Sequence, residues 1–178
     1  MSVSLRCYST SLGCPKNRVD TERLLGSLGV ALVPVESPDE AELVFINTCA
    51  FIQPATEESV RTIAQAIADI EELPKRPLLA VAGCLVGRYH AEDLAPELLE
   101  VDLWLDNSDL EAWPAMLARK LGLPEPTVPG RILSTGPPSA WLKISDGRRP
   151  ACSFFAIPTI RGGHRSHCTD MLVSAASA

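Results

Sequence analysis

The sequence predicts an α/β fold in which a five-stranded parallel sheet is covered by helices on both faces. Short apolar runs alternate with helix-like segments over residues 3–121, which is the pattern of repeated strand–helix crossovers. The runs at 43–46 and 78–82 are apolar throughout, as in strands buried on both faces. Three of the cysteines each follow an apolar run and recur at intervals of 35 residues, about one crossover: Cys14, Cys49 and Cys84.

The first crossover lies in residues 3–28. Residues 3–8 alternate around Leu5 and Cys7 and predict the first strand, with Cys7 in the core. Asn17 or Asp20 is a candidate cap for a helix that ends near residue 28. Residues 30–35 predict the second strand.

The remaining units follow the same order along the chain. The third strand, 43–46, precedes a helix that begins near Pro54 and shows regular apolar spacing up to residue 70. The fourth strand, 78–82, precedes a helix over 85–94. The last unit is a strand over 101–105 and a helix over 109–121.

The expected strand order brings the cysteines together. Five strands joined by right-handed crossovers fit the flavodoxin-like order 2-1-3-4-5, in which the first, third and fourth strands are neighbours. Those are the strands that precede the three recurring cysteines. Ligands of such sheets bind at the carboxyl ends of the strands, so we expect the three thiols to converge at one edge.

The composition changes after residue 121. Residues 122–140 hold five prolines and three glycines and are expected to be a linker between the first domain, 1–121, and a second, 141–178. A strand is expected at 141–144. Because a barrel domain typically needs upward of ~200 residues, the second domain is expected to be incomplete.

Charge and cysteine content narrow the function classes. The net charge of −6 argues against a broad nucleic-acid surface, so no direct nucleic-acid binding is expected. No apolar run reaches the ~20 residues of a membrane span and the start lacks a signal peptide, so we expect a cytoplasmic protein without a membrane partner. In that compartment six cysteines favour metal ligands or reactive thiols over disulfides.

Three thiolates from three separate loops favour an iron–sulfur cluster. Thiolates suit zinc or iron–sulfur centres, but the close cysteine pairs of zinc sites are missing from these loops. A four-iron cubane held by three cysteines keeps one iron open for sulfide, persulfide or substrate. The alternative is that the three cysteines are small buried hydrophobes at strand ends. Four nearby polar residues could assist a ligand or serve the turns and the surface: Asn17, Asn47, Gln53 and Arg88.

Three motifs resemble the amino-terminal domain of the radical S-adenosylmethionine methylthiotransferases. They are Ser-Leu-Gly-Cys-Pro-Lys-Asn-Arg-Val-Asp-Thr-Glu at 11–22, Asn-Thr-Cys-Ala-Phe-Ile at 47–52 and Ala-Gly-Cys-Leu-Val-Gly-Arg-Tyr at 82–89. Trp-Leu-Lys-Ile-Ser-Asp-Gly at 141–147 and Ala-Ile-Pro-Thr-Ile-Arg-Gly at 156–162 resemble the start of the family's radical domain, a barrel. Pro15-Lys16 after the first cysteine resembles the RimO branch.

The resemblance implies a two-cluster transferase. One 4Fe-4S cluster would be held by Cys14, Cys49 and Cys84, and would hold or supply the sulfur group. A second 4Fe-4S cluster in the radical domain would bind S-adenosylmethionine and split it into the radical that activates the substrate. The substrate and partner implied for the RimO branch is ribosomal protein S twelve, on which an aspartate is methylthiolated.

The second cluster motif departs from the family pattern. The family carries a Cys-x-x-x-Cys-x-x-Cys loop there, but this chain has Arg148 and Phe155 at two of the positions and keeps only Cys152. Neither guanidinium nor phenyl is a useful iron ligand, so reductive cleavage of S-adenosylmethionine is not supported. We therefore expect this truncated chain alone to be inactive. The alternative function is a non-catalytic iron–sulfur or partner-binding module descended from the enzyme.

The remaining motifs carry weaker hypotheses. A zinc site from Cys152, His164, His167 and Cys168 is conceivable, but the expected state of these residues is a disordered tail. The arginines at 148, 149, 161 and 165 are expected to form a solvated basic patch. A nucleotide-binding flavodoxin-like domain lacks support, because no Gly-rich phosphate loop follows the first strand.

Overall fold

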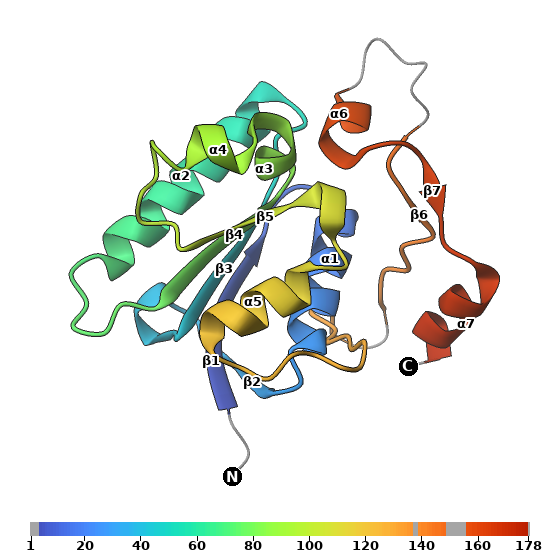
Figure 1. Ribbon diagram of the computed structural model, residues 1–178, viewed down its shortest axis with the longest axis horizontal. Helices are drawn as coiled ribbons and strands as arrows, with labels where there is room; N and C mark the ends of the chain where they lie inside the picture. The colour runs from blue at the N-terminus through green and yellow to red at the C-terminus, as the bar shows by residue number, and fades with distance from the viewer. Residues whose placement is uncertain (1–3, 137–138, 149–155, 178) are drawn as a thin grey trace.

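The computed structural model describes residues 4–136, 139–148 and 156–177. A parallel five-stranded sheet has the order β2-β1-β3-β4-β5, which confirms the predicted α/β class and the flavodoxin-like order. Figure 1 shows the sheet between two layers of helices. Its strands are β1 (Ser4–Ser11), β2 (Ala31–Pro34), β3 (Leu43–Thr48), β4 (Leu78–Gly83) and β5 (Leu103–Asp106).

The helices divide between the two faces of the sheet. One face carries α2 and α3, and the other carries α1 and α5 (Figure 1). The helical segments up to residue 121 are α1 (Pro15–Ser27), η1 (Pro38–Glu40), α2 (Gln53–Ile70), α3 (Cys84–Tyr89), α4 (Ala91–Leu94), η2 (Asn107–Asp109) and α5 (Trp113–Leu121). None of the helices in the described part of the chain is long and apolar enough to cross a membrane.

Strand β3 is buried on both faces, as its unbroken apolar run predicts. Val44 and Ile46 pack toward α2, while Leu43 and Phe45 pack toward α1 and α5. All four side chains are fully buried. Alternation along a strand thus divides the core into two layers, one on each side of the sheet.

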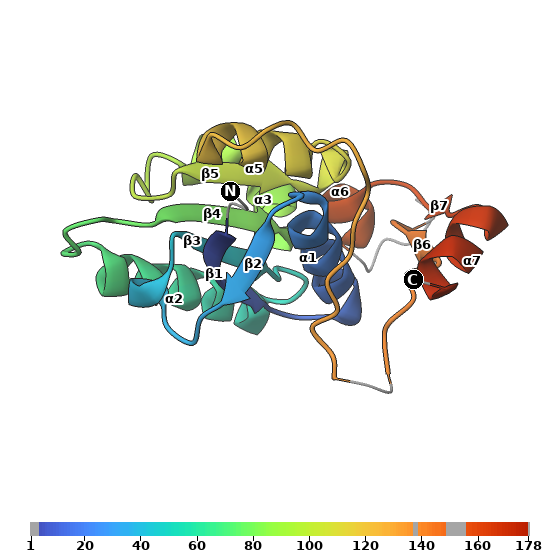
Figure 2. The same ribbon diagram turned by 90° about the horizontal axis from the view of Figure 1, so that it is seen from below.

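The described residues after 121 run back over the first domain before they form small elements of their own. Figure 2 shows this segment passing along α1 on its way to β6 (Ser145–Asp146) and then α6 (Ile157–Arg161), β7 (Arg165–Ser166) and α7 (Thr169–Ser177). The crossing needs glycine on both sides, because a Cβ on Gly26 would strike the backbone of Arg131 and one on Gly130 would strike that of Gly26. Glu22 holds the segment by accepting hydrogen bonds from Arg131 Nε at 2.9 Å and Ser134 Oγ at 2.6 Å.

Several local predictions were wrong. The helix expected over 85–94 is divided at His90, whose φ of 60° ends α3 and begins α4. Residues 141–144 do not form a strand, and β6 begins only at Ser145. Lys143 of that run is instead drawn inward to two carboxylates, which a regular strand pattern does not predict. The expected disordered tail forms α7.

Candidate functional site

The three recurring cysteines lie at the carboxyl ends of three adjacent strands. Cys14 is the N-cap residue of α1, Cys49 directly follows β3, and Cys84 is the first residue of α3 after β4. Gly13 brings two of the loops into contact, because a Cβ at this position would lie 2.6 Å from Cys49 Sγ. Its φ of 81° is also a conformation that favours glycine.

Asn17 joins the three cysteine loops. Its side chain is fully buried, and its Nδ2 donates to Leu12 O and to Thr48 O, both at 2.8 Å. Its Oδ1 lies 3.9 Å from Cys84 Sγ. The suggestion that Asn17 caps α1 was wrong, since Cys14 occupies the cap and the Asn17 side chain binds loop carbonyls instead.

A second set of polar side chains, Asn47 and Thr48 at the end of β3, lies next to Asn17. Asn47 Nδ2 donates to Asn17 O at 2.9 Å and to Thr21 Oγ1 at 3.1 Å. Thr48 Oγ1 donates to Ala82 O at 2.5 Å and accepts from Leu85 N at 3.2 Å. These bonds connect the end of β3 to α1, to β4 and to the first turn of α3, so the loops that carry the cysteines are braced before any ligand binds.

The Cys49 loop has further anchors on the opposite face. Cys49 N donates to Ser59 Oγ at 3.0 Å, and Ser59 Oγ donates back to Cys49 O at 2.7 Å. Arg88 Nη1 donates to Ala50 O at 2.7 Å, so Arg88 supports this loop through its backbone. Gln53 instead pairs with Glu57 at the exposed surface of α2.

The three thiols differ in exposure. Cys14 is exposed, Cys49 is half-buried and Cys84 is buried. Burial raises the pKa of the Cys84 thiol; the Arg161 guanidinium opposes this rise, and the charges of Cys49 and Cys14 add to it. Cys84 therefore shares one electrostatic environment with the other two. Cys7 lies apart in the core of β1, where burial raises its pKa to about 12.

A buried ion network lies beside the cysteine loops. Arg161 Nη1 is 3.1 Å from Asp20 Oδ2 and 3.0 Å from Asp146 Oδ2, while Lys143 Nζ is 2.5 Å from Asp20 Oδ1 and 2.6 Å from Asp146 Oδ2. Burial tends to raise the pKa of Asp146, but Arg161 and Lys143 hold it at about 2. The expectation that Arg161 belongs to a solvated patch was wrong, because only 6% of it is exposed.

Sequence reasoning assigned no function to this network. Asp20 lies in the motif at 11–22 and Arg161 in the motif at 156–162, but neither motif by itself indicates that the two side chains pair. The usable signal is the pair Lys143 and Asp146, two opposite charges three residues apart in a stretch that is otherwise uncharged from residue 132 to 147. Such a pair indicates buried charge compensation, although it does not name the partners.

The residues proposed for other metal sites do not assemble among those described. Cys152 and Phe155 lie outside the described residues. His164 and Cys168 are exposed, and Arg148 is held by its backbone N–H, which donates to Gly162 O at 3.2 Å. Within 4–136, 139–148 and 156–177, no three His, Cys, Asp or Glu side chains form a group that could hold a single metal ion.

The donor set at the strand ends suits a cluster better than a single ion. In a cubane each thiolate binds a different iron, so the sulfurs surround a volume and stand farther apart than the ligands of one ion. Cys14, Cys49 and Cys84 supply three soft donors from three braced loops, and thiolate sulfur is the donor type that iron–sulfur clusters use. The stretch 148–155 does not fit a second cluster, because Cys152 is its only thiol.

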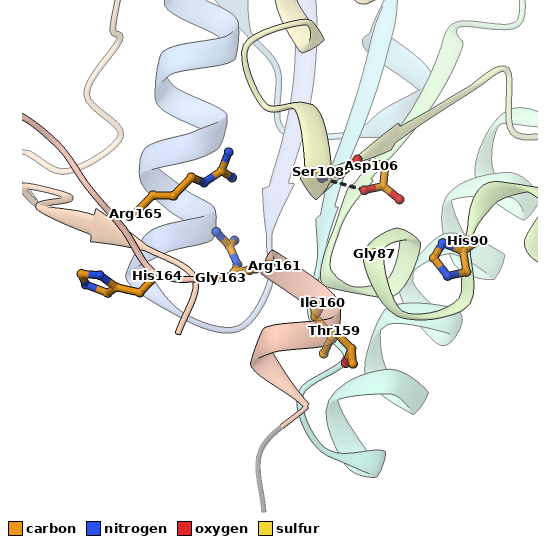
Figure 3. A pocket seen from close by; sticks show the side chains of 11 residues that line it. Gly87, His90, Asp106, Ser108, Thr159, Ile160, Arg161, Gly163, His164 and Arg165 are labelled. Atoms are coloured by element: carbon orange, nitrogen blue, oxygen red, sulfur yellow. Dashed lines mark hydrogen bonds between the residues drawn. The ribbon is translucent and has the colours of Figure 1, made fainter. Parts of the chain in front are cut away.

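An open groove lies next to the site, between α3, η2 and α6. Its volume is about 490 Å³, and its walls include His90, Asp106, His164 and Arg165. Figure 3 shows Arg161 reaching from α6 toward α1, on the side of the groove away from His90 and Asp106. Arg161 therefore lines the groove and also binds Asn17, which joins the cysteine loops.

Comparisons with known proteins agree on one family. The model of "Uncharacterized protein family UPF0004" matches residues 6–106. The chain is 68% identical over 165 residues to a protein named ribosomal protein uS12 methylthiotransferase RimO from Nitratidesulfovibrio vulgaris (strain DP4). Proteins of the same name from Oleidesulfovibrio alaskensis and Lawsonia intracellularis are 62% and 54% identical.

These relatives are longer than the chain. The matches cover 93% to 97% of this chain, but only 38% or 39% of each relative. The chain therefore spans less than half the length of the curated relatives that it matches.

Proposed function

Because the chain belongs to the family described as Uncharacterized protein family UPF0004, we propose that it is the cluster-binding portion of a RimO-type methylthiotransferase. Its target would be ribosomal protein uS12, the protein named by its relatives. A ribosomal target implies work in the cytoplasm. The observation that supports the proposal most directly is the placement of Cys14, Cys49 and Cys84 at the carboxyl ends of β1, β3 and β4.

Each of the three cysteines would ligate one iron of a 4Fe-4S cluster. When bound, such a cluster presents an open iron at which a sulfur group is held for transfer. The chain's own residues orient the ligands: Asn17 joins the loops, Ser59 holds Cys49, and Thr48 holds the first turn of α3. Cys14, the most exposed of the three, would face the entering sulfur donor or substrate.

We propose that this chain by itself does not cleave S-adenosylmethionine. Three cysteines are needed for the cluster that carries out this step in the family, and this chain has Arg148 and Phe155 at two of those positions. One thiol, Cys152, cannot hold a cubane, so no radical step is assigned to these residues. The same departure favours the alternative of a non-catalytic iron–sulfur or partner-binding module.

Anaerobic reconstitution with iron and sulfide tests the proposal. We expect about four irons per chain, from the stoichiometry of one cubane, and no methylthiolated uS12 when S-adenosylmethionine and a reductant are supplied. Serine at any of the three ligand positions should remove most of the iron. Cys7→Ser is the matched control, since that thiol is buried in β1 and should not change the iron content.

Two results would contradict parts of the proposal. Iron content that is unaffected by Cys14→Ser, Cys49→Ser and Cys84→Ser would reject the ligand assignment. Eight irons per chain with product formation would show that the chain is a complete enzyme, and would reject both the inactivity and the non-catalytic alternative.

A further inference from the structure

Arg161 reaches the cysteine site from a distant part of the chain. It lies at the end of α6, beyond the proline-rich segment, and is separated from Asn17 by 144 residues in sequence. Its Nη2 donates to Asn17 Oδ1, the oxygen that also faces Cys84 Sγ. Arg161 and Cys84 therefore share Asn17 Oδ1 as a neighbour, and the positive charge of Arg161 opposes the rise in the pKa of the Cys84 thiol. One cation thus binds the residue that joins the loops and lies beside one of the three thiols.

The ion network fixes the direction of this guanidinium. Nη1 is held by Asp20 of α1 and Asp146 of β6, and both carboxylates are also bound by Lys143. With Nη1 occupied by carboxylates, the planar fork of arginine turns Nη2 toward Asn17 and Cys84. All four charged side chains of the network are at most 6% exposed, so water screens the arrangement little.

We propose that Arg161 is a positioning residue for the three-cysteine site, where its guanidinium, held on Asn17 Oδ1 beside Cys84, raises the reduction potential of the bound cluster. The inference rests on the proposed cluster site. A positive charge beside a ligating sulfur stabilises the reduced, more negative state of an iron–sulfur cluster. Arg161 thus raises the potential of the amino-terminal cluster from the segment that follows the linker.

The test compares two variants that each remove one cation from the same network. Arg161→Gln removes the charge that lies beside Cys84, while Lys143→Gln removes a neighbouring charge that binds Asp20 and Asp146. Both are reconstituted anaerobically, iron is counted, and the midpoint potential is measured by spectroelectrochemistry. We expect Arg161→Gln to shift the potential to more negative values, and Lys143→Gln to cause a clearly smaller shift.

Arg161→Lys guards against loss of folding in Arg161→Gln. It keeps a charge for Asp20 and Asp146 but cannot bridge them to Asn17 beside Cys84, so it should also lower the potential. If circular dichroism shows that both Arg161 variants are unfolded, nitrogen-15 NMR of the reconstituted wild-type protein provides the test instead. Reduction of the cluster to its paramagnetic state should then broaden the Arg161 guanidinium signals.

The outcomes separate this inference from the proposed function. Four irons in every protein with equal potentials would overturn the role of Arg161 and leave the cluster site intact. Sharp Arg161 signals in the reduced wild type would do the same. No iron in the wild type would instead overturn the proposed function, and this inference with it.

Discussion

Asn17 is the residue on which the geometry of the cysteine loops depends. It is fully buried and uses both ends of its amide, donating to Leu12 O and Thr48 O and accepting from Arg161. A shorter side chain would leave two carbonyls and a guanidinium group without this partner. The loops that carry Cys14 and Cys49 would then lose the hydrogen bonds that this amide provides between them.

Asn17→Ala should therefore lower the free energy of unfolding by about 3 kcal/mol, because buried groups left unsatisfied cost about 1–3 kcal/mol each and part of this cost relaxes. Urea denaturation measures the change. Asn107→Ala is the matched control, since Asn107 is 1% exposed but its amide has no hydrogen-bond partner in the described part of the chain. That variant should change stability by less than about 1 kcal/mol. Equal losses would contradict the role of Asn17.

The buried carboxylate of Asp146, also a single residue, predicts how the stability of the protein depends on pH. Arg161 and Lys143 hold its folded-state pKa at about 2, below its ordinary value, so its contribution to stability is present above pH ~4 and is lost as the pH falls toward 2. The contribution is about 2 kcal/mol. The free energy of unfolding, measured between pH 6 and pH 2, should fall less steeply with decreasing pH in Asp146→Asn than in the wild type. The exposed Asp39→Asn, with the same change in charge, should keep the wild-type slope.

At the scale of elements, the turn from β4 into α3 presents the third cysteine. Gly83 adopts φ 99° and ψ −155°, a region open almost only to glycine. A Cβ there would also strike Asn47 Oδ1 and lie 2.5 Å from Thr48 O. The abrupt turn places Cys84 at the start of α3 and beside Asn17, so the backbone of this turn determines where the buried thiol lies.

Gly83→Ala should cost more than about 3 kcal/mol, because the backbone strain and the clash add together. Gly29→Ala separates the two effects: its φ is 69°, but nothing lies within 4 Å of an added Cβ. This control should cost only about 1 kcal/mol. Thermal or urea unfolding of both variants measures the difference, and similar costs would show that the contact with Asn47 yields freely.

At the scale of the whole molecule, two buried charge groups attach the segment after residue 121 to the first domain. Glu22 binds Arg131 and Ser134, and Asp20 binds Lys143 and Arg161. Both acids belong to α1, the helix that begins at Cys14. The segment that carries Arg161 is therefore coupled to the cysteine site through a single helix.

The double variant Asp20→Asn, Glu22→Gln should release this segment while the sheet remains folded. Breaking a buried pair leaves uncompensated charge, which costs about 3–5 kcal/mol. Hydrogen exchange followed by mass spectrometry should show residues 139–148 exchanging at least about tenfold faster, with β3 unchanged. Glu57→Gln on the exposed surface of α2 serves as the control. Unchanged exchange at 139–148 would show that other contacts hold the segment.

The sequence by itself determined the α/β class, the strand order and the placement of each recurring cysteine at the end of a strand. These follow from local patterns, since apolar runs and helical spacing are set by residues close in sequence. Only the tertiary structure decided that Asp20 meets Lys143 and Arg161, partners 123 and 141 residues away. Such pairs depend on the path of the proline-rich segment over α1 and on compensation of charge in a water-poor interior, and neither is encoded in a local period.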